Sequence, residues 1–158
     1  MEILNLFNTN LIVTNLEARS KEDIFEKLYD KLYKNGFVKK DYLRALIERE
    51  QNFPTGLKLE SYGVAIPHTD PEYVEKAAIS VATLKKPVIF KNMADPTEDV
   101  PINIVFMIAL NEAHSQVRVL EQLIQLIQNE EKMKEIIKSN NAEEIINLIK
   151  KAICFESK

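Results

Sequence analysis

The feature that most constrains the fold is a nine-residue run from Ile102 to Leu110, in which Asn103 is the one polar residue. The run is far shorter than the roughly 20 apolar residues that a membrane-spanning helix needs. A continuous apolar run of this length is typical of a strand that is buried on both faces of a sheet. We therefore expect residues 102–110 to form a central strand.

Helical patterns precede this run. Apolar residues recur at helical spacing over residues 20–36 and 41–50, and each stretch is expected to form an amphipathic helix. The first helix is expected to begin after Ser20, whose hydroxyl can cap a free backbone N–H group. It is expected to end at Gly36, which suits a left-handed C-cap.

Shorter strands and a loop are expected around these helices. Four segments carry β-branched or apolar runs that are typical of strands: residues 8–16, 64–67, 77–84 and 87–90. Between the second helix and the 64–67 strand, Pro54 disfavours a helix and Gly56 permits a reversal of the chain. We therefore expect residues 51–62 to form a loop.

After the central strand the pattern is helical to the end of the sequence. A long helix is expected from about residue 112, followed by shorter helices over residues 130–139 and 142–151. The apolar face of the long helix is expected to comprise Val117, Leu120, Leu123, Ile124 and Ile127. The order of elements predicts one α/β domain over residues 1–158, with a mixed central sheet and helices on both faces.

Charge, cysteine content and glycine spacing exclude several functional classes. With 21 Lys and Arg against 24 Asp and Glu, the net charge of −3 argues against a general nucleic-acid-binding surface, which needs an excess of positive charge. The single cysteine, Cys154, excludes an intrachain disulfide and a multi-cysteine zinc site. The three glycines, Gly36, Gly56 and Gly63, fit neither the GxGxxG nor the GxxxxGK(S/T) phosphate-binding motif, and no cofactor is expected.

The sequence also bears on location. The N-terminal residues MEILNLFNTN have neither the cationic segment nor the long apolar segment of a secretory signal. No uncharged stretch approaches the length of a membrane span, and a lone cysteine suits a reducing compartment. These features predict a cytoplasmic protein that is not embedded in a membrane.

The chain contains two histidines, and both are expected where an ordered element meets a loop. His68 directly follows the 64–67 strand, and His114 lies at the start of the long helix. In open α/β sheets, ligands bind beyond the carboxyl ends of the strands, where loops converge over a rigid support. A single histidine in such a place is more often an ordinary surface residue, and a second one at a comparable position weakens that interpretation only modestly.

Imidazole can accept a phosphoryl group. Its pKa of about 6.5 leaves a lone pair on one nitrogen at neutral pH, while a hydrogen bond can hold the other nitrogen. The transition state of phosphoryl transfer spreads negative charge over three oxygens, so catalysis depends on positioning and on nearby positive charge. A second imidazole, the N–H groups at the start of the long helix and the guanidinium of Arg49 are candidate sources of that charge.

Four motifs stand in order along the chain: Arg49-Glu50, Thr55-Gly56, the run GVAIPH at residues 63–68, and His114 at a helix start. Together they resemble the enzyme IIA domain of the fructose–mannitol class in the bacterial sugar phosphotransferase system. The resemblance extends from about residue 3 to residue 151. Within that class, the runs FPTGL and PHTD are most similar to the galactitol-specific enzyme IIA.

The resemblance implies a phosphocarrier. His68 corresponds to the family's phosphate-accepting histidine, which takes a phosphoryl group from the histidine-containing phosphocarrier protein and passes it to a cysteine of enzyme IIB. Uptake and phosphorylation of the sugar, by implication galactitol, then involve the membrane protein enzyme IIC. His114 corresponds to the second active-site histidine, and Arg49 to the arginine that helps to hold the phosphoryl group; no metal is implied.

Two other functions fit the same residues. A regulatory module of the same fold would use its phosphorylation state to control a partner protein and would pass nothing to a sugar. A zinc hydrolase would use His68, Asp70 and His114 as ligands and keep a fourth position open.

Two smaller features complete the predicted site. Thr69 stands where the family commonly has Gly, Ala or Cys, and we expect it to cap a turn. Contacts with partner proteins are expected on an exposed apolar rim formed by Phe53, Leu57 and Tyr62.

Overall fold

The computed structural model describes residues 3–156, and the side chains of this range except those of 114, 115 and 154–156. At its centre is a five-stranded sheet in the order β1-β4-β5-β3-β2. The strands are β1 (Ile12–Leu16), β2 (Gly56–Lys58), β3 (Gly63–Ala65), β4 (Ala78–Lys91) and β5 (Asp99–Ala109). β1 pairs with β4, and β3 with β5, in parallel, whereas β4–β5 and β2–β3 are antiparallel. The predicted mixed sheet is confirmed.

β5 is the middle strand of the sheet, which confirms the prediction for the apolar run. Its side chains alternate between two hydrophobic cores, because successive residues of a strand point to opposite faces. Ile104 and Phe106 belong to one core, and Val105 and Met107 belong to the other. Both faces of β5 are therefore covered.

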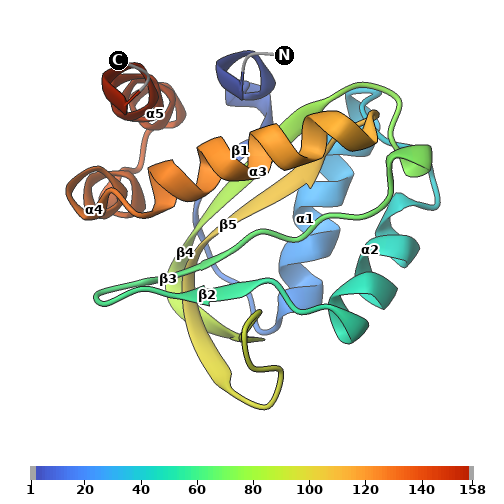
Figure 1. The fold of residues 1–158 in the computed structure, drawn as a ribbon, viewed down its shortest axis with the longest axis horizontal. Coiled ribbons are helices and arrows are strands. Elements are labelled where there is room, and N and C mark those ends of the chain that lie inside the picture. Colours follow the sequence, from blue (N-terminus) through green and yellow to red (C-terminus); the bar gives the residue numbers. More distant parts are fainter. Residues whose placement is uncertain (1–2, 157–158) are drawn as a thin grey trace.

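Helices form the two outer layers (Figure 1). The helices are α1 (Lys21–Lys34), α2 (Tyr42–Asn52), α3 (Ala113–Ile127), α4 (Glu130–Lys138) and α5 (Ala142–Glu156), with 3-10 segments η1 (Ile3–Leu6), η2 (Thr9–Leu11) and η3 (Pro71–Tyr73). α3, α4, α5 and η1 cover one face of the sheet, and α1 and α2 cover the other. This confirms the predicted layers. Within residues 3–156, no helix is both long and apolar enough to cross a membrane.

The predicted signals at the ends of α1 are present. The Ser20 hydroxyl accepts a hydrogen bond from the backbone N–H of Asp23 at 3.3 Å, which satisfies one of the free donors of the first turn. After the helix, Gly36 has φ of 79°, in the left-handed region that favours glycine. The helix α1 therefore begins after the Ser20 cap and ends before Gly36, as the sequence predicted.

The prediction of two strands at 77–84 and 87–90 is wrong, because both belong to the single strand β4. The pairing of β4 with β5 shifts in register between Thr83 and Val88. Lys85 and Lys86 lie in this irregular stretch and point to solvent. Their polar side chains resembled a break between strands, although the backbone continues as one strand through the shift in register.

The prediction of a loop throughout 51–62 is also wrong, because β2 lies within it at the edge of the sheet. Gly56 does not reverse the chain. A Cβ atom at this position would lie 2.5 Å from the carbonyl oxygen of Lys91, so glycine is needed for close approach of the two backbones. Three residues of strand are too short to produce a recognisable pattern in the sequence.

The predicted apolar face of α3 is confirmed in part, because Leu123 and Ile127 are buried and Leu120 packs against the core, whereas the other two residues are exposed. Val117 is 62% exposed and Ile124 is 37% exposed. The buried residues of the helix are Val119, Leu123, Leu126 and Ile127. Two overlapping apolar stripes run along this helix, and its packing against the sheet and α5 decides which of them is covered.

Candidate functional site

The segment that follows β3 places His68 at the margin of the sheet. β3 is buried along its whole length, and the carbonyl oxygen of Pro67 accepts a hydrogen bond from the N–H of Ile108 at 2.9 Å. His68 itself forms an isolated parallel bridge with Ile108. The half-buried histidine is therefore held by the central strand, beyond the carboxyl end of β3, as the sequence predicted.

The imidazole of His68 has one nitrogen committed to the backbone. Nδ1 lies 2.8 Å from the carbonyl oxygen of Ile66. Because a carbonyl oxygen can only accept, Nδ1 carries the proton, and the lone pair of the neutral ring is on Nε2. Burial lowers the pKa of His68, and the nearby charge of Arg49 lowers it further, against the opposing effects of the Ile66 bond and Asp70. The ring is accordingly neutral at pH 7, with Nε2 available as a nucleophile.

Arg49 lies in the last turn of α2, close enough for its charge to act on His68. Its Nη1 is 3.9 Å from Oδ1 of Asp70, and its guanidinium lies over the ring of Phe53, 5.2 Å from the ring centre. Among the described residues, the buried Nε of Arg49 has no hydrogen-bond partner. The structure thus brings two of the three predicted site residues together and leaves a buried donor of the arginine unused.

The third predicted residue, His114, belongs to the first turn of α3, but its side chain lies outside the described residues. One contact nevertheless joins this helix to the site. Nε2 of Gln116 donates a hydrogen bond to the carbonyl oxygen of Thr69 at 3.2 Å. The beginning of α3 is therefore tied to the residue directly after His68, and Thr69 itself is buried.

A buried carboxyl group beside Arg49 escaped the sequence prediction. Glu50 is 4% exposed, and its Oε2 and Oε1 accept hydrogen bonds from the N–H and the hydroxyl of Thr55, both at 2.8 Å. Burial raises the pKa of Glu50 to about 7, although the two bonds from Thr55 oppose the shift. A signal did exist, because Tyr42, Leu46 and Glu50 recur every four residues and so share one face of α2.

Glu50 is expected to make the stability of the protein depend on pH. Its pKa rises from 4.5 to about 7 on folding, so the folded protein binds this proton more tightly. The contribution of Glu50 to the free energy of unfolding therefore falls as pH rises from about 4.5 to about 7 and is constant above that range. The variant Glu50→Gln stays neutral, and between pH 5 and pH 8 it should gain roughly 2 to 3 kcal/mol relative to the original protein.

Urea unfolding of both proteins at several pH values measures this difference. The matched control is Glu48→Gln, which makes the same change at an exposed position of the same helix and should give a constant difference. A constant difference for Glu50→Gln as well would contradict the raised pKa.

The predicted apolar rim is confirmed in part. Phe53 is 62% exposed, and Leu57 is partly buried. Tyr62 is wrong as a rim residue, because it is buried and its hydroxyl donates a hydrogen bond to the carbonyl oxygen of Ile127. Its ring packs in the core and its polar end reaches the C-terminus of α3, a common arrangement for buried tyrosines.

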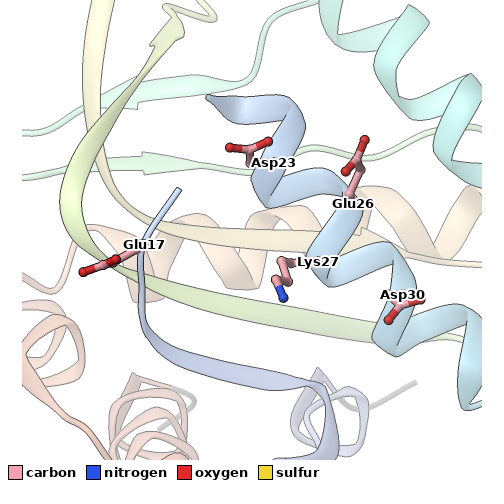
Figure 2. A pocket seen from close by; sticks show the side chains of 5 residues that line it. All are labelled: Glu17, Asp23, Glu26, Lys27 and Asp30. Atoms are coloured by element: carbon pink, nitrogen blue, oxygen red, sulfur yellow. The ribbon is translucent and has the colours of Figure 1, made fainter. Parts of the chain in front are cut away.

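A separate hollow lies between the end of β1 and α1, and its lining is shown in Figure 2. Its side chains are Glu17, Asp23, Glu26, Lys27 and Asp30. Glu17 pairs with Lys85 at 2.6 Å and Asp30 pairs with Lys34 at 2.9 Å, and the α1 side chains point in different directions (Figure 2). Two of the five charges are thus used in surface ion pairs, Asp23 accepts a hydrogen bond from the backbone N–H of Arg19, and the side chains do not converge on a shared centre.

The described residues contain no group of three His, Cys, Asp or Glu side chains that could hold a metal ion. Of the three ligands that a zinc hydrolase would need, the structure describes the side chains of His68 and Asp70. The third, His114, lies outside the described side chains. Within the described side chains, the geometry at His68 supports nucleophilic attack by its Nε2 atom.

Comparison with known proteins links this arrangement to one family. A sequence model of the family described as phosphoenolpyruvate-dependent sugar phosphotransferase system, EIIA 2, matches residues 5–152. The chain is 29% identical over 122 residues to the galactitol-specific EIIA component of Escherichia coli K12, covering 73% of this chain and 81% of that protein.

Two further relatives from Bacillus subtilis are much longer than this chain. The fructose-specific EIIABC component is 28% identical over 153 residues, covering 94% of this chain and 23% of that protein. The transcriptional regulator ManR is 30% identical over 109 residues, covering 69% of this chain and 15% of that protein. The chain thus spans less than a quarter of the length of either relative.

Solved structures have the same fold. A IIA protein of Streptococcus mutans, PtxA, superimposes with a TM-score of 0.80 at 23% identity, covering 96% of this chain and 95% of that one. The mannitol IIA of E. coli gives a TM-score of 0.74 at 26% identity, covering 90% and 98%. The same TM-score, at 24% identity with 90% and 96% covered, is found for the complex of enzyme IIA and phosphorylated enzyme IIB of the E. coli mannitol system.

Proposed function

From the premise that this chain belongs to the EIIA 2 family of the phosphoenolpyruvate-dependent sugar phosphotransferase system, we propose that it carries a phosphoryl group on Nε2 of His68. The observation that carries this proposal is the bond from Nδ1 of His68 to the carbonyl oxygen of Ile66. It leaves Nε2 as the nitrogen with a lone pair, and the lowered pKa keeps that lone pair free at neutral pH.

Loading of the carrier is an exchange between two imidazoles. The lone pair on Nε2 of His68 attacks the phosphorus of a phosphohistidine on the donor protein. A new N–P bond forms, the donor's N–P bond breaks, and the electron pair of the broken bond returns to the donor nitrogen. The His68 ring then bears positive charge, which the bond from Nδ1–H to Ile66 stabilises.

Unloading reverses the direction of attack. A cysteine thiolate of the acceptor attacks the same phosphorus, an S–P bond forms, and the N–P electron pair returns to Nε2 of His68. Both exchanges pass through a transition state with charge on three phosphoryl oxygens. Stabilisation of that shared state, rather than tight binding of the phosphorylated form, lets the carrier load and unload with comparable ease.

Positive charge for the transition state comes, in this proposal, from groups around His68. Arg49 has a buried Nε donor with no partner among the described side chains, and its charge already acts on His68. The backbone N–H groups in the first turn of α3 and the His114 imidazole are proposed as further donors, and the Gln116 contact keeps this helix end beside the site. The proposal needs neither a metal nor a bound cofactor.

The proposed donor is the histidine-containing phosphocarrier protein, and the proposed acceptor is a cysteine of enzyme IIB. Support for the acceptor comes from the E. coli mannitol system, in which a complex of enzyme IIA and phosphorylated enzyme IIB has been solved. The exposed Phe53, beside Arg49, offers an apolar contact for either partner. We place this relay in the cytoplasm, ahead of a membrane enzyme IIC, with galactitol as the proposed sugar because of the galactitol-specific relative.

A regulatory role is the second candidate. It is favoured by the 30% identity to the transcriptional regulator ManR over 109 residues. In that case the phosphoryl group on His68 would change binding to a partner protein and would not continue to a sugar. Both candidates share the chemistry at His68, so they differ only after the carrier has been loaded.

One labelling experiment tests the shared chemistry and separates the candidates. The purified protein is incubated with the phosphorylated histidine-containing phosphocarrier protein, and the phosphate is located by mass spectrometry and by ³¹P–¹⁵N coupling. We expect a single phosphoryl group on Nε2 of His68, followed by transfer to enzyme IIB and to sugar in the presence of membranes. Phosphate on another residue overturns the proposal, and loading of His68 without transfer to any IIB favours the regulator.

A further inference from the structure

We propose that Glu50 is a positioning residue, which acts through Thr55 and Ile66 to hold the His68 ring with its proton on Nδ1. The inference deepens the proposed function and rests on it, since the ring orientation matters only if Nε2 is the reacting atom. Three hydrogen-bonding steps lead from the carboxyl group to the imidazole.

The first step fixes Thr55 to α2. Glu50 accepts hydrogen bonds from both the backbone N–H and the hydroxyl of Thr55, at 2.8 Å each, and both residues are buried. Two bonds to one residue fix its position and orientation more firmly than a single bond does. Loss of the carboxyl group would leave a buried N–H without a partner, at a typical cost of about 1 to 3 kcal/mol.

The next two steps reach the histidine. The carbonyl oxygen of Thr55 accepts a hydrogen bond from the N–H of Ile66 at 3.2 Å. The carbonyl oxygen of Ile66 in turn faces Nδ1 of His68 at 2.8 Å. Thr55 and Ile66 flank the paired residues Gly56 and Ala65 at the end of the β2–β3 ladder, so the Thr55 anchor fixes the last contact of this ladder before the site.

The contact between Glu50 and Thr55 also relates the position of His68 to that of Arg49. Glu50 directly follows Arg49 on α2, so the same turn of helix holds the cation and fixes the backbone that orients the nucleophile. A shift of about 1 Å between reacting groups can slow a reaction about a hundred-fold. By joining both groups to one rigid helix, the Glu50–Thr55 contact keeps their separation constant.

Two substitutions at position 50 test this role. Glu50→Ala removes both bonds to Thr55, whereas Glu50→Gln keeps an oxygen for the Thr55 N–H and an N–H₂ donor for its hydroxyl. We expect Glu50→Ala to show a mixture of His68 tautomers in ¹⁵N NMR spectra and to accept phosphate about ten-fold more slowly. Glu50→Gln should retain the Nδ1–H tautomer and a rate near that of the original protein. Glu48→Gln, the exposed change on the same helix, should alter neither measurement.

The outcomes are decisive in each case. A folded Glu50→Ala protein with the original tautomer and rate overturns the inference. Glu50→Gln that is as slow as Glu50→Ala, with its tautomer intact, also overturns it, because charge and not positioning would then be responsible. If Glu50→Ala does not fold, Thr55→Val and Thr55→Ser replace it: valine should weaken the tautomer preference and serine should preserve it, and a valine variant without effect overturns the inference.

The NMR measurement needs no phosphate, so the inference and the proposed function can fail separately. If His68 is never phosphorylated but Glu50→Ala changes its tautomer, the function fails and the positioning contact remains. If His68 is phosphorylated at the original rate in folded Glu50→Ala, the function remains and the positioning role fails.

Discussion

Replacement of His68 by glutamine is expected to abolish phosphate uptake from the phosphorylated histidine-containing phosphocarrier protein. Glutamine has no nitrogen lone pair that can form a stable N–P bond, so the covalent step is lost rather than slowed. We expect the labelling rate to fall about a thousand-fold or more, to background. The measurement is the incorporation of phosphate over time, with a thermal melt to show that the variant is folded.

The chain offers an internal control for this experiment, because it contains two histidines. In His68→Gln protein, any phosphohistidine would have to be on His114. In His114→Gln protein, by contrast, labelling should continue at His68 but more slowly, since the proposed role of His114 is to stabilise charge. Full labelling of His68→Gln would show that the assignment of the carrier to His68 is wrong. Complete loss of labelling in His114→Gln alone would show the same.

The second large effect is expected at Gly63, the first residue of β3. A Cβ atom there would lie 2.0 Å from the carbonyl oxygen of Pro101 and 3.0 Å from its carbonyl carbon. These are backbone atoms of β5, so no side-chain rotation relieves the clash, and the two strands must separate. We expect Gly63→Ala to lose about 3 kcal/mol of stability or more, and the melting temperature to fall by about 10 °C.

The effect of Gly63→Ala should extend to the site, because β3 carries the chain to His68. Phosphate uptake is expected to fall by more than the loss of folded protein accounts for. Gly36→Ala is the matched control, since it adds the same methyl group where no atom lies within 4 Å. Its cost should be about 1 kcal/mol, from the left-handed backbone alone, with uptake unchanged. Equal stability losses for the two variants would contradict the packing argument.

Strong periodic patterns explain what could be predicted of the fold. The apolar run forms most of β5, and helical spacing located all five helices to within a few residues. The largest difference is at the C-terminal end of α5, which extends to Glu156 rather than to residue 151. β2 has three residues, too few for a pattern, and the solvent-facing Lys85 and Lys86 in β4 resembled a strand end. Strand order was not predictable, because it depends on pairing between segments far apart in the sequence.

The candidate site was predictable to a similar degree. His68 could be found because it follows a short buried strand, and Arg49 because it lies in a recognisable motif. Glu50 was missed as a buried group, since an acidic residue on a helix is usually exposed, and its burial depends on the partner Thr55. Tyr62 was likewise assigned to the surface although it is buried. Its burial depends on a hydrogen-bond partner, the carbonyl oxygen of Ile127, that only the folded chain provides.

Under the proposed function, the position of Arg49 over Phe53 has a consequence for when the phosphoryl group on His68 would react. In the free protein the phenyl ring is largely open to solvent, and water weakens the field of the neighbouring guanidinium. A protein that docks on Phe53 would displace that water. The electrostatic field of the Arg49 guanidinium would then be stronger, although the guanidinium would not move. Hydrolysis in solution and delivery to a docked acceptor would then differ in their local dielectric, so that the phosphoryl group is kept while the carrier diffuses and released on arrival.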